Sequence, residues 1–449
     1  MSCNSVREVT CLTFLGPVLP LPRVLLAMHI HLGAFESTHI FGAGRDILGT
    51  TRHIELWESD LNRLLTQGIT MLRYSAPWHR IEAHPGTYDW SWFDGPMEFM
   101  RANNMVPILD PLHHTSFPSW LKDGFLNPRF PELYTCFLRH LCARYPWAHH
   151  YTIFNEPLPT TLFCSYTGMW YPHLASHRTF VRMLLQVGRA ICLGCECVKK
   201  LIPARFIHVD TCEHHNAIDR RSSAWTRFAN ARRFLVTDLV LGLIGRDHEL
   251  YSYLTRNGAS DADLAWFARH PARIDVLGLD YYAHSEMDWA WSPEKRRPDI
   301  TPVLSESRGF AAIANEYVAR YGLPVMLSET NLVGTIHERI SWLKLMEAEC
   351  EELASSGIDF RGFCWYPSID TTDWSNACTR CTGVIDRQGI WSLAEGTMDR
   401  IGTELSGIYG ALARGKITAA QIPDYGFGPD LAHRLRAYRQ EPRPVAKIA

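Results

Sequence analysis

Short apolar runs alternate with longer amphipathic stretches along most of the chain. A brief apolar run bounded by polar or turn residues is typical of a buried strand, and apolar residues at every third or fourth position are typical of a helix packed on a sheet. Such runs predict strands at residues 28–35, 69–75, 105–112, 150–155, 205–211, 274–282, 324–329 and 360–367. The amphipathic stretches predict helices at residues 53–67, 131–144, 174–193, 225–243, 309–321 and 337–355.

Regular alternation of strand and helix predicts parallel strands joined by crossover helices, an α/β fold. Eight such units favour a closed (β/α)8 TIM barrel over a doubly wound open sheet. We expect one barrel domain at residues 28–412, with loop insertions at 283–308 after the sixth strand and 368–394 after the eighth. Residues 1–27 are interpreted as a leader or an over-extended N-terminus, and 413–449 as a C-terminal tail.

Composition and charge narrow the class of protein. Hydrophobic residues make up 46% of the 449 and charged residues 20%, which indicates a large core and excludes general disorder. The net charge of −2 provides no basic excess for binding nucleic acid. Residues 11–28 are apolar, but three prolines and Arg23 interrupt them, so we expect neither a membrane helix nor a membrane partner.

Cysteine usage bears on the compartment and on metal binding. The 13 cysteines are scattered and follow no clear secretory signal, which favours a reducing, cytoplasmic location. Cys192, Cys195 and Cys197 end an apolar helical stretch, which favours buried thiols. Cys378 and Cys381 have C-x-x-C spacing in a predicted loop, where a metal or redox role stays open.

Two glutamates follow predicted strands, at the carboxyl ends where TIM-barrel enzymes have their active sites. Glu156 ends the fourth predicted strand and Glu329 the seventh, and these strands face each other across the mouth of a barrel. Opposed carboxylates suit glycoside hydrolysis, with retention at a separation of about 5–5.5 Å and inversion at about 6.5–9.5 Å. The alternative is a pair of salt bridges at the barrel rim.

Six segments resemble motifs of glycoside hydrolase family 1, in the same order along the chain. Residues 152–157 resemble the acid/base motif T-F-N-E-P, and residues 327–329 are similar to the nucleophile motif I/V-T-E-N-G. The other four are residues 72–78 (R-F-S-x-x-W), 114–121 (H-W-D-L-P-x-W-L), 278–282 (G-x-N-Y-Y) and 370–374 (D-N-F-E-W).

The resemblance implies a retaining β-glycosidase of the clan A barrel type that acts on a small carbohydrate without a cofactor or metal. Glu156 would then be the acid/base and Glu329 the nucleophile. Asn155 would bind the 2-hydroxyl of the sugar, and Arg73 and Tyr282 would flank the nucleophile.

The same resemblance implies further sugar contacts. His114 would bind a hydroxyl, Trp374 would stack beneath the ring and Asp373 would hold far-side hydroxyls. The remaining substrate-binding candidates are Glu36, near the family's strand-one Gln, and Trp365, with Tyr366 as its alternative in the alignment.

Departures from the motifs cluster in the sugar-recognition positions. Thr330-Asn331 replaces Asn-Gly after the nucleophile, Thr115 replaces a Trp, Asp280 replaces the strand-six Asn and Asp373 replaces a Glu. These changes indicate a distant member whose sugar, linkage and oligomeric state stay open.

Two other functions fit parts of the sequence. His29-Ile30-His31 resembles the H-x-H of metal-dependent amidohydrolases, and further imidazoles and carboxylates that suit zinc are His208, His214, His215 and Asp370. Asp210 and Glu213 on the fifth strand could also reach the pocket. A non-catalytic sugar-binding barrel is the remaining alternative. Loss of activity after treatment with a chelator would distinguish the metal enzyme.

Overall fold

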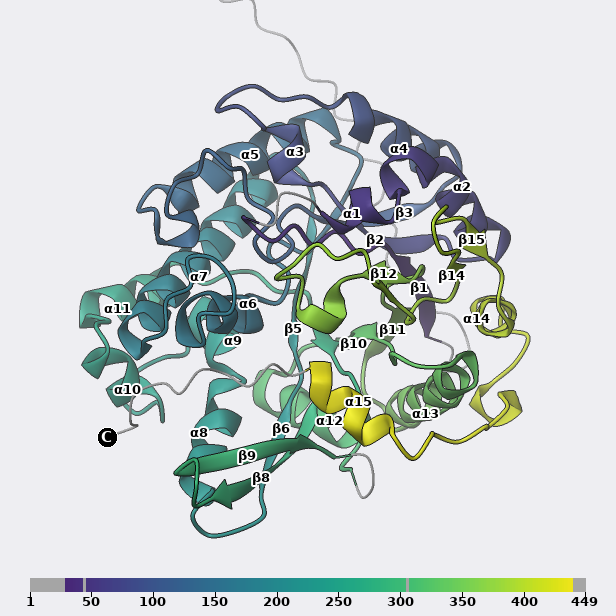
Figure 1. Ribbon diagram of the computed structural model, residues 1–449. Helices are drawn as coiled ribbons and strands as arrows, with labels where there is room; N and C mark the ends of the chain where they lie inside the picture. The colour runs from purple at the N-terminus through teal and green to yellow at the C-terminus, as the bar shows by residue number, and fades with distance from the viewer. Residues whose placement is uncertain (1–28, 43–45, 304–306, 439–449) are drawn as a thin grey trace, which may run out of the picture.

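Eight parallel strands form a closed barrel at the centre of the molecule, in a computed structural model that describes residues 29–42, 46–303 and 307–438 (Figure 1). The strand order is β1-β11-β10-β7-β5-β4-β3-β2. The bounds are β1 Ile30–Ala34, β2 Met71–Ser75, β3 Val106–Asp110, β4 His150–Tyr151, β5 Arg205–Thr211, β7 Val276–Asp280, β10 Val325–Thr330 and β11 Phe360–Trp365. The predicted (β/α)8 barrel is confirmed, and the expected leader lies outside the described residues.

Helices surround the barrel (Figure 1). The main ones are α2 His53–Thr66, α4 Ser91–Ala102, α5 Phe130–Arg144, α7 His177–Leu201, α8 Ser223–Arg232, α12 Phe310–Tyr321, α13 Ile336–Ser355 and α14 Glu404–Ala413. The others are α1 Ile47–Thr50, α3 Trp78–Ile81, α6 Pro157–Thr161, α9 Leu235–Val240, α10 Tyr251–Arg256, α11 Asp261–Arg269 and α15 Leu431–Tyr438. Capping residues fix several helix starts; at α13, Thr335 and Glu338 satisfy each other's backbone N–H groups.

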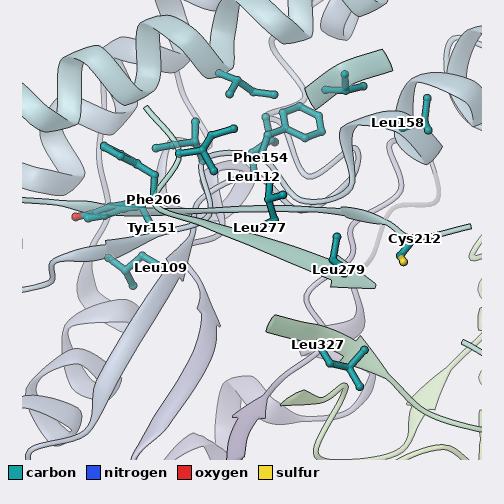
Figure 2. Close-up of a cluster of buried hydrophobic side chains, with 14 of the residues drawn as sticks. Leu109, Leu112, Tyr151, Phe154, Leu158, Phe206, Cys212, Leu277, Leu279 and Leu327 are labelled. Carbon is teal, nitrogen blue, oxygen red and sulfur yellow. The ribbon is translucent and has the colours of Figure 1, made fainter. Parts of the chain in front are cut away.

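The core has two layers, because successive side chains of a strand point to opposite faces. The barrel interior holds Leu32, Ala34, Met71, Ile108, Ile207, Val209, Val276, Met326, Cys364 and Tyr366. Outward-pointing residues of the same strands pack against the helices. Figure 2 shows Leu277 and Leu279 of β7 near Leu327 of β10 in this outer layer.

An irregularity in β10 turns Glu329 toward the barrel mouth. Leu327 packs in the outer layer, so strict alternation would also send Glu329 outward. Leu327 pairs with Leu279 of β7, yet Glu329 pairs with the next residue, Asp280. The extra residue in β10 is the signature of a β-bulge, which re-aims side chains. Glu329 therefore reaches the inward-facing Arg73 of β2.

The predicted loop at residues 283–308 contains a hairpin instead. Strands β8 (Glu286–Ser292) and β9 (Arg297–Pro302) pair antiparallel, and β6 (His214–Ala217) adds to β8. Figure 1 shows this small sheet projecting beside α8. The sequence signal for β8 was the spacing of the large apolar residues Met287, Trp289 and Trp291 at every second position, which is typical of a strand. The loop at 368–394 carries the short strands β12 Thr371–Thr372, β13 Ile385–Asp386 and β14 Ser392–Leu393; β14 pairs with β15 Arg400–Ile401.

Two predicted helices have different bounds. Helix α7 continues to Leu201, so Cys192 and Cys195 lie inside it and are buried, while 225–243 divides into α8 and α9. In the predicted tail, Leu431 and Leu435 of α15 are buried, and Arg434 forms an ion pair with Glu338 of α13. Within the described ranges, no helix is both long and apolar enough to span a bilayer.

We predict that Asp60→Asn strongly destabilises the fold. Both Asp60 oxygens accept hydrogen bonds from Arg400 at 2.6 Å, and His53 contacts one of them at 2.8 Å, all with buried side chains. Removing the charge leaves a buried guanidinium without its counterion, which costs about 3–5 kcal/mol. Urea denaturation measures the change.

Glu196→Gln is the matched control, because it breaks the exposed pair with Lys200 on α7. This variant should lose at most about 0.5 kcal/mol. Equal losses in the two variants would contradict the assignment of a structural role to the Asp60 cluster.

Candidate active site

The carboxylates Glu156 and Glu329 lie close together at the carboxyl end of the barrel. One oxygen of each, together with one oxygen of Asp280, lies within 4.8 Å of the others. Asn155 continues the pairing of β4 beyond its end through a bridge to His113, and Glu156 follows it. The pair that the sequence placed on the fourth and seventh strands is therefore brought together.

Local backbone geometry holds Glu156 in place. Its N–H bonds to Val209 O on β5 at 3.1 Å, and its φ is +45°, in the left-handed region. A residue before proline prefers extended backbone, so Glu156 ahead of Pro157 is held against its local preference. Such positions are common at functional sites.

Arg73 is the buried cation that organises the site. One guanidinium nitrogen donates to Glu329 Oε1 and the other to Asn155 Oδ1, both at 2.5 Å. Tyr282 donates its hydroxyl to the second oxygen of Glu329 at 2.6 Å. The carboxylate of Glu329 thus has a hydrogen-bond donor on each oxygen, and one of the two donors is a buried cation.

Glu156 has the opposite environment. Burial raises its pKa well above the ordinary value, and the nearby charges of Glu329 and Asp210 raise it further. His113 and Arg73 lower the pKa, but they do not outweigh burial. Burial therefore favours the protonated form of Glu156, which is the form that a general acid requires.

His113 carries a second buried charge that sequence analysis did not single out. It contacts Asp110 at 2.7 Å and Glu36 at 3.3 Å. Burial lowers the pKa of His113, but these two carboxylates raise it to about 10. Burial raises the pKa of Glu36, and His113 lowers it to about 2. The available signal was the His113-His114 pair at the end of the third strand, where the motif identified only one of the two.

Two further predicted sugar contacts, Trp374 and His114, lie beside the cluster of His113, Asp110 and Glu36. Trp374 donates its indole N–H to Glu36 at 3.1 Å, and the ring of His114 lies 5.7 Å from the ring of Trp374. His114 Nε2 is 3.7 Å from Glu156. Burial and the charge of His113 hold the pKa of His114 well below its usual value, so this imidazole is neutral.

Two predicted contacts do not lie in the site. Trp365 points outward into the helix layer and donates to Gln388 O; its neighbour Tyr366 faces inward, over Arg73 at 4.8 Å. Asp373 accepts from the backbone N–H groups of Thr382 and Gly383, so its carboxylate holds the loop instead of facing the mouth. The alternation of β11 explains the first correction, and the turn at Asp373 explains the second.

The residues of the metal-hydrolase hypothesis do not converge on the mouth. His29 and His31 lie at the start of β1 and contact Glu347 of α13, each at 3.0 Å. Asp370 forms ion pairs with Arg339 and Arg387. On β5, His208 is buried, and Asp210 accepts the Leu158 N–H and lies close enough to Glu156 for its charge to act there. His214 lies at the start of β6 and Glu213 just before it, while Cys378 is buried and Cys381 is exposed.

Comparisons with known proteins point to glycosidases. The model of a β-galactosidase family, glycoside hydrolase family 42, matches residues 50–134, a segment that includes Arg73 and His113. The β-galactosidase BgaH of Haloferax lucentense is 30% identical over 104 residues, which are 23% of this chain and 15% of that protein.

Solved structures share the fold along most of the chain. The β-glucosidase of Thermotoga maritima in complex with azafagomine matches with a TM-score of 0.73 at 16% identity, over 87% of this chain and 99% of that one. The family 1 β-glucosidase of the same organism matches with a TM-score of 0.72 at 15% identity, over 86% and 98%.

Together these findings relate the chain to the TIM-barrel glycoside hydrolases of clan A, by sequence over one segment and by fold over most of its length. The family whose model matches is family 42, whereas the motifs resemble family 1. Membership of family 1 therefore stays a prediction.

We predict that His113→Gln destabilises the fold most near pH 6. The folded-state pKa of about 10 lies above the value of about 6.5 for an unfolded histidine, so protonation favours the folded state. This contribution is complete below pH 6.5 and is lost as the pH rises through 10. At pH 6 the variant leaves the buried carboxylates of Asp110 and Glu36 without the imidazolium between them, at a cost of up to about 3–5 kcal/mol.

Denaturant unfolding at pH 6 and pH 10 compares wild type and variant. His140→Gln, on the exposed side of α5, should change stability little at either pH. A difference for His113→Gln that is the same at both pH values would refute a buried imidazolium.

Proposed function

We propose that this protein is a retaining β-glycosidase that hydrolyses small β-glycosides or oligosaccharides, with Glu329 as nucleophile and Glu156 as acid/base. The observation that carries the proposal is the closeness of the two carboxylates, whose nearest oxygens lie within 4.8 Å. Such close oxygens favour the separation of about 5–5.5 Å between carboxyl groups in retaining enzymes over the about 6.5–9.5 Å in inverting ones.

In the first step, a Glu329 oxygen attacks the anomeric carbon. The bond from that carbon to the leaving oxygen breaks, and Glu156 transfers its proton to this oxygen. In the second step, the Glu156 carboxylate takes a proton from water while the water oxygen attacks the anomeric carbon. The ester bond to Glu329 breaks, and both carboxyl groups return to their first state with the sugar configuration retained. Both steps use groups of the chain and water.

The surrounding residues support this assignment of roles. Arg73 and Tyr282 donate hydrogen bonds to the two oxygens of Glu329, which orients the nucleophile. Asn155 is fixed by Arg73 beside the reacting carbon, where a contact to the 2-hydroxyl can strengthen in the transition state. Glu36, His113, His114 and Trp374 line the side of the mouth where the sugar hydroxyls would bind.

Substitution of either carboxylate tests the proposal on nitrophenyl β-glycosides (glucoside, galactoside, fucoside, xyloside, mannoside, glucuronide). Glu329→Ala should abolish turnover, because no covalent intermediate forms. Glu156→Ala should lose about 10²–10⁴-fold with a poor leaving group and much less with a very good one, since protonation then matters less. NMR of the first product should show the β anomer.

Glu395→Ala, in an exposed position, is the control and should keep wild-type turnover. Wild-type rates in Glu329→Ala or Glu156→Ala, or an α product, would refute the mechanism.

The pH dependence provides a separate prediction. Glu156 must be protonated for the first step, so kcat/KM should be present below its raised pKa and fall as the pH rises through it. The alkaline limb should therefore lie well above the usual carboxyl pKa of about 4.3. In Glu156→Ala, the residual activity on a very good leaving group should lack this limb. An unchanged limb in the variant would assign it to another group.

A further inference from the structure

A third carboxyl group, Asp280, stands beside the catalytic pair and has no role in the steps above. It ends β7, where it pairs with Thr211 of β5 on one side and Glu329 of β10 on the other. Its side chain is fully buried. One of its oxygens lies within 4.8 Å of oxygens of both Glu156 and Glu329, so it borders the space in which the anomeric carbon must lie.

Only one oxygen of Asp280 has a partner in the described part of the chain. Oδ1 accepts the hydroxyl of Ser328 at 2.6 Å, whereas Oδ2 is buried and makes no hydrogen bond. A buried polar atom without a partner is costly, and native proteins rarely retain one without a function. A substrate oxygen within reach of Oδ2 would satisfy this atom.

The charges around Asp280 favour its protonated form. Burial raises its pKa well above the usual value, and the carboxylates Glu329 and Glu156 raise it further. Arg73 lowers the pKa, but this guanidinium is already bonded to Glu329 and Asn155. The other titratable groups that its charge affects are Tyr282, Cys212 and Cys364, none of them a cation. A neutral carboxylic acid in such a pocket is a hydrogen-bond donor.

We propose that Asp280 binds the substrate directly, by donating a hydrogen bond from its Oδ2 hydroxyl to a sugar oxygen adjacent to the anomeric carbon. The oxygens at that place are the ring oxygen and the 2-hydroxyl. The inference rests on the glycosidase function proposed above and adds a contact to it. Because an Asn side chain is isosteric and its amide also donates, Asp280→Asn preserves the contact, while Asp280→Ala removes it.

The comparison of these two variants tests the proposal by kcat/KM on the best nitrophenyl glycoside. Asp280→Ala should lose about 5- to 150-fold, the range for removing one partner of a buried hydrogen bond. Asp280→Asn should stay within about threefold of wild type. Ser328→Ala removes the protein hydrogen bond to Oδ1, and should lose less than Asp280→Ala, because Oδ2 still reaches the substrate. Thermal melting verifies that each variant is folded.

A 2-deoxy glycoside identifies the oxygen that is bound. If the penalty of Asp280→Ala disappears on this substrate, the contact is to the 2-hydroxyl; if it persists, the contact is to the ring oxygen. Either result supports the proposal. A folded Asp280→Ala that keeps wild-type kcat/KM overturns it, as does an Asn variant that loses as much as the Ala variant.

Calorimetry of the same glycoside with Glu329→Ala separates the two hypotheses. Adding Asp280→Ala to this background should weaken binding at least about fivefold. A wild-type protein that binds the glycoside without cleaving it would refute the glycosidase, while the effect of Asp280 on affinity would still decide the contact. Unchanged affinity in the double variant would refute the contact whatever the turnover.

Discussion

The ion pair between Arg73 and Glu329 is the interaction on which the arrangement of the barrel mouth depends. A guanidinium that is 2% exposed must be paired, and Arg73 is paired to β10 through Glu329 and to the end of β4 through Asn155. The same cation lies over the ring of Tyr366 just beyond β11. One side chain of β2 thereby connects strands from opposite sides of the barrel, and the positions of Glu329 and of the residue before Glu156 are set together.

That arrangement also explains how chemically similar carboxyl groups acquire different charges. Glu329 takes the cation and the Tyr282 hydroxyl, so the neighbouring Glu156 and Asp280 face its negative charge in a buried space without an equivalent partner. Three carboxylates this close cannot all ionise. The second buried cation, His113, lowers the pKa of Glu156 but does not outweigh burial, and Asp110 and Glu36 contact its two nitrogens. The raised pKa values of Glu156 and Asp280 are thus a consequence of which carboxylates Arg73 and His113 contact.

The barrel was predictable from sequence because its signals are periodic and repeated, and the opposed pair followed from strand order alone. The finer errors have local causes. Trp365 and Tyr366 are adjacent, so a shift of one residue reverses which of them faces the mouth. Asp373 stands at the position of a motif residue, but its carboxylate accepts hydrogen bonds from its own loop, and its φ is +66°. The bulge that turns Glu329 inward has no sequence signal of its own, and the motif identified the residue without explaining its direction. The charge of His113 could not be predicted, because it depends on two carboxylates, Asp110 and Glu36, that only the fold brings next to it.

The departures from the family motifs acquire a common physical meaning in this setting. Asp373 no longer faces the mouth, and Glu36 has both oxygens occupied, by Thr38 and His113 on one and Trp374 on the other. The carboxylates expected to hold distant hydroxyls are therefore committed within the protein. Asp280, beside Glu156 and Glu329, keeps one buried oxygen without a partner in the described part of the chain. The carboxyl group that keeps an oxygen available for a ligand therefore lies on β7, on a different strand from Glu156 and Glu329.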